Sequence, residues 1–260
     1  MEFKGFLKAL KEKAQLGFCS MYPAPGIIER IGQDWDWCWI DSQHGQWKIV
    51  EVMDAVRVCD LIGIFSMVRV PGYESGTIGK ILDTGCHAIM VPMIDTQKLA
   101  KEAVKATKFP PLGKRSYGGR RPIDLYGRAY SHLDRPQPLL VCQIESEEAL
   151  QNIEQIAQVE GVDALFFGPD DLAQHRKIPM DSERPARLFY PEIDKVAETA
   201  KKTGKIAAGV FTTSDDLLYA LNRGFRLIAC SGDVPLLAAG SRTAARNARE
   251  IFATHLKERT

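Results

Sequence analysis

Eight short apolar runs, separated by segments with helical spacing, constrain the fold of this 260-residue chain more than any other feature. Each run is apolar throughout rather than alternating, as is typical of parallel strands buried on both faces. Strands that alternate with helices favour a (β/α)₈ barrel, which commonly contains about 250 residues. An open, doubly wound sheet is the alternative. We expect one α/β TIM-barrel domain over residues 1–260, with strands at residues 16–22, 36–40, 65–70, 88–94, 139–145, 164–168, 206–211 and 226–232.

The intervening segments carry helix signals. Residues 46–63 place apolar side chains near one face, and residues 146–161 begin at Ser146, a good N-cap, and stop at Gly161. Residues 1–17 read as an amphipathic helix with lysines on its polar face, without the continuous apolar core of a secretory signal.

The composition excludes several classes of partner. The 34 basic and 33 acidic residues leave a net charge of +1, so nothing directs the chain to nucleic acid or to an anionic membrane. No apolar run approaches the roughly 18 residues that span a bilayer. The six cysteines form no C-x-x-C motif, and we expect them to be reduced, which fits a cytoplasmic protein.

The longest irregular stretch is residues 109–138, rich in proline, glycine and basic residues. So long a loop in a compact domain is usually functional or makes subunit contacts.

Polar side chains follow several of the apolar runs. Catalytic groups of a (β/α)₈ barrel lie where the strands end, and a charge buried there is costly unless it is paired or binds a ligand. The polar residues at these strand ends are Asp41, Gln43, His44, Arg69, Gln143, Glu145, Asp170 and Asp171.

Two of these carboxylates, Glu145 and Asp171, follow neighbouring strands and suit a hard divalent cation with open positions for substrate. Arg69 can fork onto a carboxylate or carbonyl oxygen, and His44 can carry a proton near neutral pH. Each residue also has a structural explanation: Glu145 pairs with Arg69, Asp171 caps a helix, and His44 belongs to a turn. Together at one barrel mouth, these explanations are harder to sustain.

Lysine is missing from the positions that imine chemistry needs. A Schiff-base aldolase requires a desolvated lysine inside the barrel, but no expected strand has lysine at its carboxyl end. Lys205 precedes the seventh strand, on the opposite rim. This pattern favours metal-assisted chemistry.

Five stretches carry a family resemblance: DWCWIDSQHG, MVRVPG, ILDTGCHAIMVPMIDT, CQIESEEALQNIEQIAQVEGVDALFFGPDDLA and GFRLIACSGD. With these, the chain from about residue 5 to residue 250 resembles the HpcH/HpaI aldolases, metal-dependent class II pyruvate aldolases related to the citrate lyase β-subunit. The resemblance implies that Glu145 and Asp171 bind a divalent cation (Mg²⁺, Mn²⁺ or Co²⁺), and that Arg69 holds the pyruvoyl oxygens and stabilises the enolate. It also implies a pyruvate site lined by Gln143, Gly168, Pro169 and Asp170.

The same resemblance pairs His44 with Asp83 as an acid/base that works through metal-bound water. Asp83 precedes the fourth strand, at the rim away from the expected site, so we expect it to reach a neighbouring subunit's site. The family also exchanges its last helix between subunits and often forms hexamers. That helix would be residues 234–259, and a homo-oligomer is expected.

Two residues depart from the family pattern. Gln43 stands where a glutamate is usual, so an amide replaces a carboxylate. Gln43 and Asp41 are both expected to surround the metal ligands without binding the metal. Asp170 stands where alanine is frequent and adds a third acid to the mouth.

The implied reaction is the reversible cleavage of a 4-hydroxy-2-oxo acid to pyruvate and an aldehyde. The alternatives are decarboxylation of oxaloacetate through the same enolate, and a non-catalytic barrel that binds a 2-oxo acid. The identity of the aldehyde is open, and its candidate contacts are Trp47, Tyr117, Arg120, Arg121 and Phe167.

Overall fold

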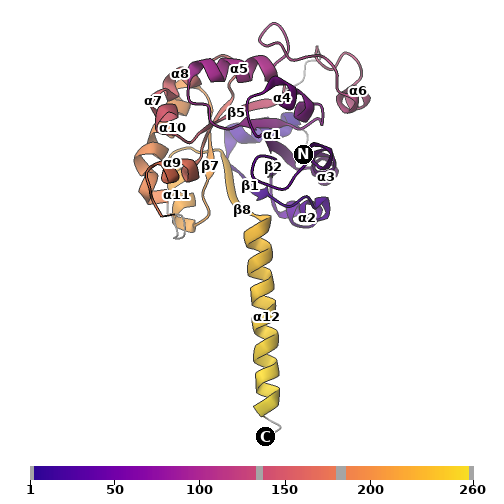
Figure 1. The fold of residues 1–260 in the computed structure, drawn as a ribbon, viewed down its shortest axis with the longest axis vertical. Coiled ribbons are helices and arrows are strands. Elements are labelled where there is room, and N and C mark those ends of the chain that lie inside the picture. Colours follow the sequence, from indigo (N-terminus) through magenta and orange to yellow (C-terminus); the bar gives the residue numbers. More distant parts are fainter. Residues whose placement is uncertain (1–2, 133–136, 180–185, 258–260) are drawn as a thin grey trace.

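The computed structural model describes residues 3–132, 137–179 and 186–257. Small parts of the expected first helix (1–2), long loop (133–136) and last helix (258–259) lie outside the described residues. Eight parallel strands close into a barrel in sequence order (Figure 1), which confirms the barrel prediction and rules out the open sheet. The strands are β1 (Gln15–Ser20), β2 (Trp37–Asp41), β3 (Phe65–Arg69), β4 (Ala88–Val91), β5 (Leu139–Ile144), β6 (Ala164–Phe167), β7 (Ile206–Val210) and β8 (Leu227–Gly232).

Helices follow the strands and cover the outside of the barrel. Ser146 accepts a hydrogen bond from the backbone N–H of Ala149 at 2.9 Å, which confirms it as an N-cap. The helices are α1 (Phe3–Glu12), α2 (Pro25–Ile31), α3 (Ile49–Ile62), α4 (Ser75–Leu82), α5 (Gln97–Thr107), α6 (Arg120–Tyr126), α7 (Glu147–Gln151), α8 (Ile153–Ala157), α9 (Pro169–His175), α10 (Tyr190–Thr203), α11 (Ser214–Asn222) and α12 (Asp233–Lys257), with two 3₁₀ helices, η1 (Gly32–Asp34) and η2 (Ala186–Phe189).

Several elements differ from the sequence prediction. The first strand ends at Ser20, and the stretch 109–138, expected to be irregular, contains the short helix α6. Two further differences have a visible cause. The expected helix over residues 146–161 breaks at Asn152, whose side-chain amide donates to the backbone carbonyl of Asp95 at 2.9 Å. The fourth strand ends at Val91 rather than at residue 94, because Met93 adopts a left-handed backbone conformation with φ of 52° that no strand can contain.

The amino end of the barrel is closed by packing. Phe6 and Leu10 of α1 are buried beneath the strands, and the Phe6 ring stacks on Phe65 with centroids 4.0 Å apart. Trp37 fills the next layer, where a Cβ on Gly17 would come within 2.3 Å of its indole ring. The barrel interior is therefore filled with side chains at this end, and the polar residues that follow the strands lie at the other.

The last helix leaves from the open end. α12 begins one residue after β8 and projects away from the barrel (Figure 1). Its first residue, Asp233, is fully buried, and one carboxylate oxygen accepts from the Ser20 hydroxyl and from the backbone N–H groups of Met21 and Tyr22 at 2.9–3.2 Å. These bonds hold the start of α12 against the end of β1. In the described part of the chain, no helix has the length and apolarity that crossing a membrane requires.

Candidate active site

A cavity of about 350 Å³ opens at the carboxyl end of the barrel. It brings together most of the polar residues that the sequence predicted at the strand ends. Its lining consists of Trp39, His44, Arg69, Gln143, Glu145, Phe166, Gly168, Pro169, Asp170, Asp171, Gln174 and Val210.

Arg69, at the end of β3, is held in place by a buried ion pair. Its Nε and Nη2 atoms donate to the two carboxylate oxygens of Asp41 at 2.9 and 2.5 Å, and the Asp41 side chain is 1% exposed. Nη1 reaches Gln143 Oε1 at 3.5 Å, and the guanidinium lies 4.7 Å from the centre of the Trp39 ring. The alternative in which Glu145 simply pairs with Arg69 is wrong, because Arg69 forms its ion pair with Asp41 and directs Nη1 to Gln143.

Asp41 also shapes the turn that carries His44. Its Oδ1 atom accepts from the backbone N–H of Gln43 at 3.0 Å and of His44 at 3.3 Å. A Cβ on Gly45 would lie 2.1 Å from the Asp41 carbonyl oxygen, so only glycine fits at this position of the turn. The turn leaves the His44 side chain exposed at the rim of the cavity.

Glu145 is a buried acid that forms no ion pair within the residues that the structure describes. It is 1% exposed; Oε1 accepts from the backbone N–H of Met93 at 2.8 Å, and Oε2 accepts from the side-chain amide of Gln143. Burial raises the pKa of Glu145 to about 7; the Met93 N–H opposes the rise and the neighbouring Asp171 carboxylate adds to it.

The backbone N–H of Met93, which donates to Glu145, belongs to a loop that is fixed by hydrogen bonds. Met93 has φ of 52°, a conformation that non-glycine residues rarely adopt, and it is stabilised by its surroundings. The backbone of Asp95 donates back to the Met93 carbonyl at 3.1 Å, and the Asp95 carboxylate accepts from the Ser146 hydroxyl. The loop after β4 is thus joined to the helix after β5, and Glu145 lies between them.

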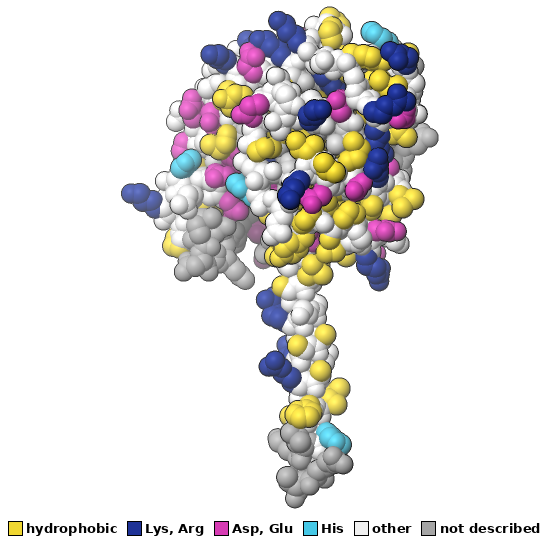
Figure 2. All heavy atoms as spheres, turned by 45° about the vertical axis from the view of Figure 1, so that its right-hand side comes forward, with side chains coloured by type: hydrophobic (Ala, Val, Ile, Leu, Met, Phe, Trp, Pro, Cys, Tyr) yellow, Lys and Arg dark blue, Asp and Glu magenta, His cyan; other side chains and the backbone are white. Residues whose placement is uncertain are grey.

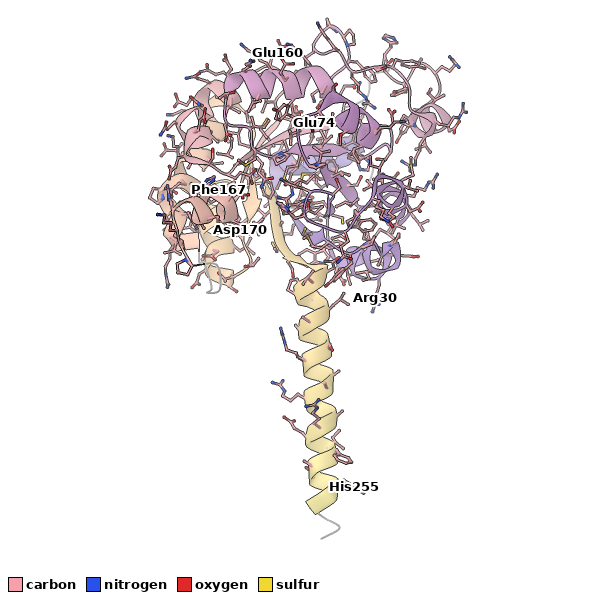
Figure 3. All side chains as sticks on the ribbon, in the orientation of Figure 1. Arg30, Glu74, Glu160, Phe167, Asp170 and His255 are labelled. Carbon is pink, nitrogen blue, oxygen red and sulfur yellow. The ribbon has the colours of Figure 1, made fainter. Side chains whose placement is uncertain are left out.

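Asp171 comes from the first turn of α9, immediately after β6. Gly168 precedes the helix as its N-cap, and a Cβ there would come within 2.7 Å of Gln143 Nε2 and 3.1 Å of Glu145. Pro169 follows and fixes the first turn. Because Gly168 is the N-cap residue, the expectation that Asp171 caps this helix is wrong. The β6–α9 junction, marked in Figure 3 by Phe167 and Asp170, delivers two acids to the rim.

The charges of the cavity fit a divalent cation. Glu145 and Asp171 are neighbours, as the raised pKa of Glu145 reflects, while the guanidinium of Arg69 is engaged by Asp41. Among the described residues there is no group of three or more histidine, cysteine or acidic side chains arranged to hold a metal. Two carboxylates are enough for Mg²⁺ or a similar ion, which keeps several water molecules and binds substrate oxygens.

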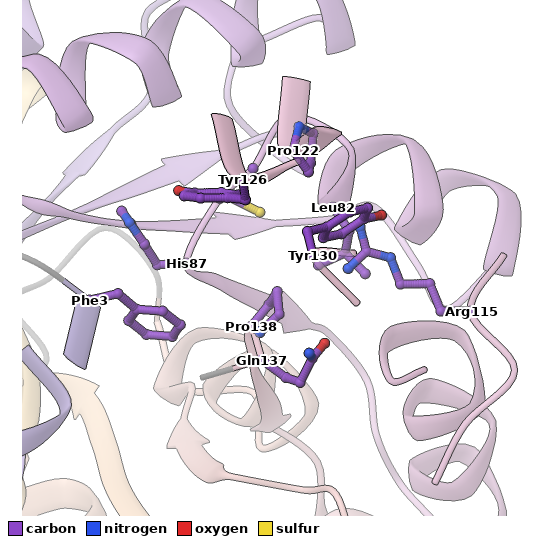
Figure 4. A pocket seen from close by; sticks show the side chains of 11 residues that line it. Phe3, Leu82, His87, Arg115, Pro122, Tyr126, Tyr130, Gln137 and Pro138 are labelled. Carbon is purple, nitrogen blue, oxygen red and sulfur yellow. The ribbon is translucent and has the colours of Figure 1, made fainter. Parts of the chain in front are cut away.

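Asp83 does not join this site. It follows α4 at the amino end of the barrel, where Arg115 Nη2 lies 3.4 Å from its carboxylate and Gly119 packs against it. Arg115 lines a second, small cavity there, together with His87 and Tyr130 (Figure 4). Within one chain, Asp83 and His44 thus belong to opposite ends of the barrel.

Four lining residues were not found from the sequence: Trp39, Phe166, Val210 and Gln174. The first three face inward at alternate strand positions, and that alternation was a usable signal. The five predicted aldehyde contacts are absent from the lining. Their side chains lie elsewhere: Trp47 donates to the Ser20 carbonyl, Tyr117 to that of Arg128, Arg120 pairs with Asp124, Arg121 pairs with Asp60, and Phe167 packs near Phe189.

Comparison with known proteins agrees with the fold and shows the family. The family profile for HpcH/HpaI aldolase/citrate lyase matches residues 25–239. A 4-hydroxy-2-oxovalerate aldolase from Novosphingobium aromaticivorans is 36% identical over 95% of both chains, and a hydroxypyruvate/pyruvate aldolase from Roseobacter denitrificans is 32% identical over 89% of this chain and 92% of its own. The crystal structure of an HpcH/HpaI aldolase/citrate lyase family protein from Burkholderia cenocepacia superposes with a TM-score of 0.85 at 26% identity, covering 95% of this chain and all of the other. The chain described here therefore belongs to the HpcH/HpaI aldolase/citrate lyase family.

Proposed function

We propose that residues 1–260 act as one carbon–carbon lyase domain that cleaves a 4-hydroxy-2-oxo acid reversibly to pyruvate and an aldehyde. The observation that carries the proposal is the pair of acids, Glu145 and Asp171, beside a preorganised Arg69 in one cavity. The aldolase names of two relatives at 36% and 32% identity support it.

Glu145 and Asp171 would hold the divalent cation (Mg²⁺, Mn²⁺ or Co²⁺). When bound, the cation supplies a Lewis acid that polarises the 2-oxo group of the substrate. The role of the protein is to keep both ligands ionised and correctly placed. The Met93 N–H and the Gln143 amide do this for Glu145.

Arg69 stabilises the charge that develops during cleavage. When the C3–C4 bond breaks, its electron pair moves onto the 2-oxo oxygen and gives the enolate of pyruvate. Asp41 fixes the guanidinium in one orientation before the reaction, so no reorganisation is needed as the charge appears. Gln143 and the backbone of Gly168–Asp170 would complete the site for the oxo acid.

His44 is the proposed proton carrier. The 4-hydroxyl group must lose its proton as it becomes the aldehyde, and C3 of the enolate must then gain one. The imidazole lines the cavity at its rim, where it can exchange protons with solvent. Gln43 lies beside it, and its Oε1 atom is buried without a hydrogen-bond partner in the described residues. The pairing of Asp83 with His44 that the family resemblance implies would require the Asp83 of a neighbouring subunit.

A homo-oligomer is part of the proposal. α12 carries apolar side chains that one chain leaves exposed, as the yellow residues along it in Figure 2 illustrate. Ile251 is 72% exposed and Phe252 is 63% exposed, which is costly in water unless another surface covers them. We expect α12 to pack on a neighbouring copy, as in a hexamer with exchanged helices, and light scattering of the purified chain tests this.

Product analysis tests the reaction. The purified protein is incubated with Mg²⁺, Mn²⁺ or Co²⁺ and 4-hydroxy-2-oxovalerate, and separately with oxaloacetate. Pyruvate with an aldehyde is the expected outcome for the first substrate. Carbon dioxide with pyruvate from oxaloacetate alone would favour the decarboxylase. Absence of both products, and of exchange of pyruvate C3 protons in deuterated water, would leave a barrel that only binds 2-oxo acids.

A further inference from the structure

A groove of about 840 Å³ lies at the amino end of the barrel, opposite the cavity of the proposed active site. It runs along α1 and the C-terminal ends of α10 and α11, which lead into β7 and β8. Its floor is apolar and includes Leu7, Leu10 and Val162. A hollow of this size is within the range of small-molecule binding sites, so the side chains that line it define a class of ligand.

The charge of the lining is strongly positive. Its one acidic side chain, Asp163, is already neutralised, because the ammonium of Lys108 lies 2.6 Å from the carboxylate. Lys108 itself does not line the groove. The cationic side chains of the lining are Lys11, Lys201, Lys205, Arg223 and Arg226.

Of these five cations, Arg223 has an anionic partner. Its Nε atom donates to Asp194 at 2.7 Å, and its guanidinium lies over the Tyr219 ring. Within residues 3–132, 137–179 and 186–257, the other four cations make no ion pair and no side-chain hydrogen bond. The groove therefore holds an excess of positive charge that the described chain does not balance.

Helix ends account for two of the four cations. Lys11 and Lys201 lie in the last turns of α1 and α10, where a cation interacts favourably with the helix dipole. Lys205 and Arg226 have no such explanation, because each stands one residue before a strand. Both are half-buried, and removing a charge from water costs free energy unless an opposite charge compensates it.

The pairing of β7 with β8 brings Lys205 and Arg226 to the same groove. The backbone N–H of Arg226 donates to the Ala207 carbonyl at 2.9 Å, so these two residues are neighbours. Ala207 follows Lys205 by two positions, and side chains two apart along a strand share a face. All three residues line the groove. An anion seated there would meet both half-buried cations at once.

We propose that this groove binds a small organic anion that carries phosphoryl groups, with Lys205 and Arg226 as its main ligands. Phosphoryl oxygens suit both residues, since lysine binds them as a point charge and arginine as a bidentate fork. Several negative charges on one molecule match several cations, and the apolar floor accommodates the organic part. The site is separate from the cavity of Glu145 and Asp171, so the proposal does not depend on the aldolase reaction.

Calorimetric titration of the full chain tests the proposal with adenosine diphosphate, inorganic pyrophosphate and adenosine. EDTA is present, so that no anion binds through a metal ion in the active-site cavity. We expect adenosine diphosphate to bind with a dissociation constant below about 1 mM at low salt. Pyrophosphate should bind more weakly, because it has no apolar part, and adenosine should not bind detectably. Added salt should weaken the binding of adenosine diphosphate by screening the charges.

Lys201 and Lys202 provide a matched pair of variants. Both are in the last turn of α10, but only Lys201 lines the groove, while Lys202 lies 3.6 Å from Glu154. Lys205→Gln and Arg226→Gln should each weaken the binding of adenosine diphosphate by at least about tenfold, the loss of one charged hydrogen bond. Lys201→Gln should weaken it less, and Lys202→Gln should leave it unchanged. Lys205→Arg should retain most of the affinity, and thermal unfolding verifies that each variant is folded.

Three results would overturn the proposal. The first is the absence of binding of adenosine diphosphate, or equal affinity in wild type, Lys205→Gln and Arg226→Gln. The second is an equal loss of affinity in Lys202→Gln and Lys201→Gln, which would show an effect of net charge alone. The third is binding of a short polyglutamate peptide as tight as that of adenosine diphosphate, which would assign the groove to an acidic protein segment instead.

Discussion

Each end of the barrel holds a carboxylate, half-buried Asp163 at the amino end and buried Glu145 at the carboxyl end, and the two ends balance its charge differently. At the amino end, Asp163 accepts from the ammonium of Lys108 at 2.6 Å and from the backbone N–H of Leu140 at 2.7 Å. At the carboxyl end, Glu145 accepts from a backbone N–H and an amide, and another acid, Asp171, interacts with it and raises its pKa. The first arrangement is complete within the chain. The second would be completed by the divalent cation that we propose, which is why we place the chemistry at that end.

Replacing each acid by its amide gives the largest expected contrast. Glu145→Gln should abolish binding of Mn²⁺ and all detectable turnover while the barrel stays folded. Asp163→Asn should keep Mn²⁺ binding and turnover but lower the free energy of unfolding by about 2 kcal/mol, because a charged hydrogen bond is lost. Calorimetric Mn²⁺ titration and urea unfolding measure the two effects. Full activity of metal-free protein, or trapping of pyruvate on the enzyme by borohydride, would refute the role of Glu145.

The next effect concerns the rim of the open end. His44→Ala should lower kcat by about 10²- to 10⁴-fold, the usual contribution of a general acid/base, with Mn²⁺ binding retained. Gln43→Glu places a negative charge near the imidazole, which favours its protonated form and should move the acidic limb of the kcat/KM profile to higher pH. Profiles of kcat/KM against pH for wild type, His44→Ala and Gln43→Glu test both expectations. Wild-type rates in His44→Ala across the pH range would show that the histidine only packs.

Arg69 tests whether preorganised geometry matters in addition to charge. Arg69→Ala should lower kcat/KM by at least about 10²-fold, as for one lost preorganised donor. It also leaves Asp41 buried and unpaired, so Arg69→Lys is the cleaner variant because it keeps the charge. We expect lysine to recover little activity, since an ammonium cannot occupy both Asp41 oxygens as the fork does. A lysine variant with near-native kcat/KM would show that charge alone is sufficient.

A smaller effect is expected from pH. The pKa of Glu145 is about 7 in the folded chain and near its ordinary 4.5 when unfolded, so the folded state binds the proton more tightly. Its contribution to the stability of the metal-free protein is therefore full below about pH 4.5 and is lost as the pH rises through 7. Metal binding needs the ionised form, so affinity for Mn²⁺ should weaken as the pH falls below 7. Thermal unfolding with and without Mn²⁺ at pH 5.5, 7 and 8.5 measures both trends, and identical metal affinity at the three values would contradict them.

The sequence predicts the barrel well because its signal is local. Each strand is a continuous apolar run, and every predicted strand is present, with bounds that differ at the ends. The strand ends locate the polar groups, so Arg69, Glu145 and Asp171 were placed at the mouth correctly. Their partners depend on the closed barrel: Asp41 and Arg69 are 28 residues apart in sequence and meet because β2 and β3 pair in register.

Backbone contributions were beyond the reach of sequence patterns. The N–H of Met93 orients Glu145, but methionine carries no preference for the left-handed conformation that presents it. The break in the helix at Asn152 has the same origin, because the Asp95 carbonyl it binds belongs to a distant loop. Asp83 was assigned from family resemblance alone, and its place beside Arg115 follows from the helix that ends there.

The position of Asp233 has a consequence for how the protein behaves on dilution. Its buried carboxylate joins the end of β1 to the first turn of α12, so the helix is rooted at the carboxyl end of the barrel, the end at which the substrate cavity opens. A second chain that covers α12 therefore stands beside the entrance through which substrate arrives. In the homo-oligomer that we propose, access to the site and assembly would be a single equilibrium, and specific activity should depend on enzyme concentration near the dissociation constant of the oligomer.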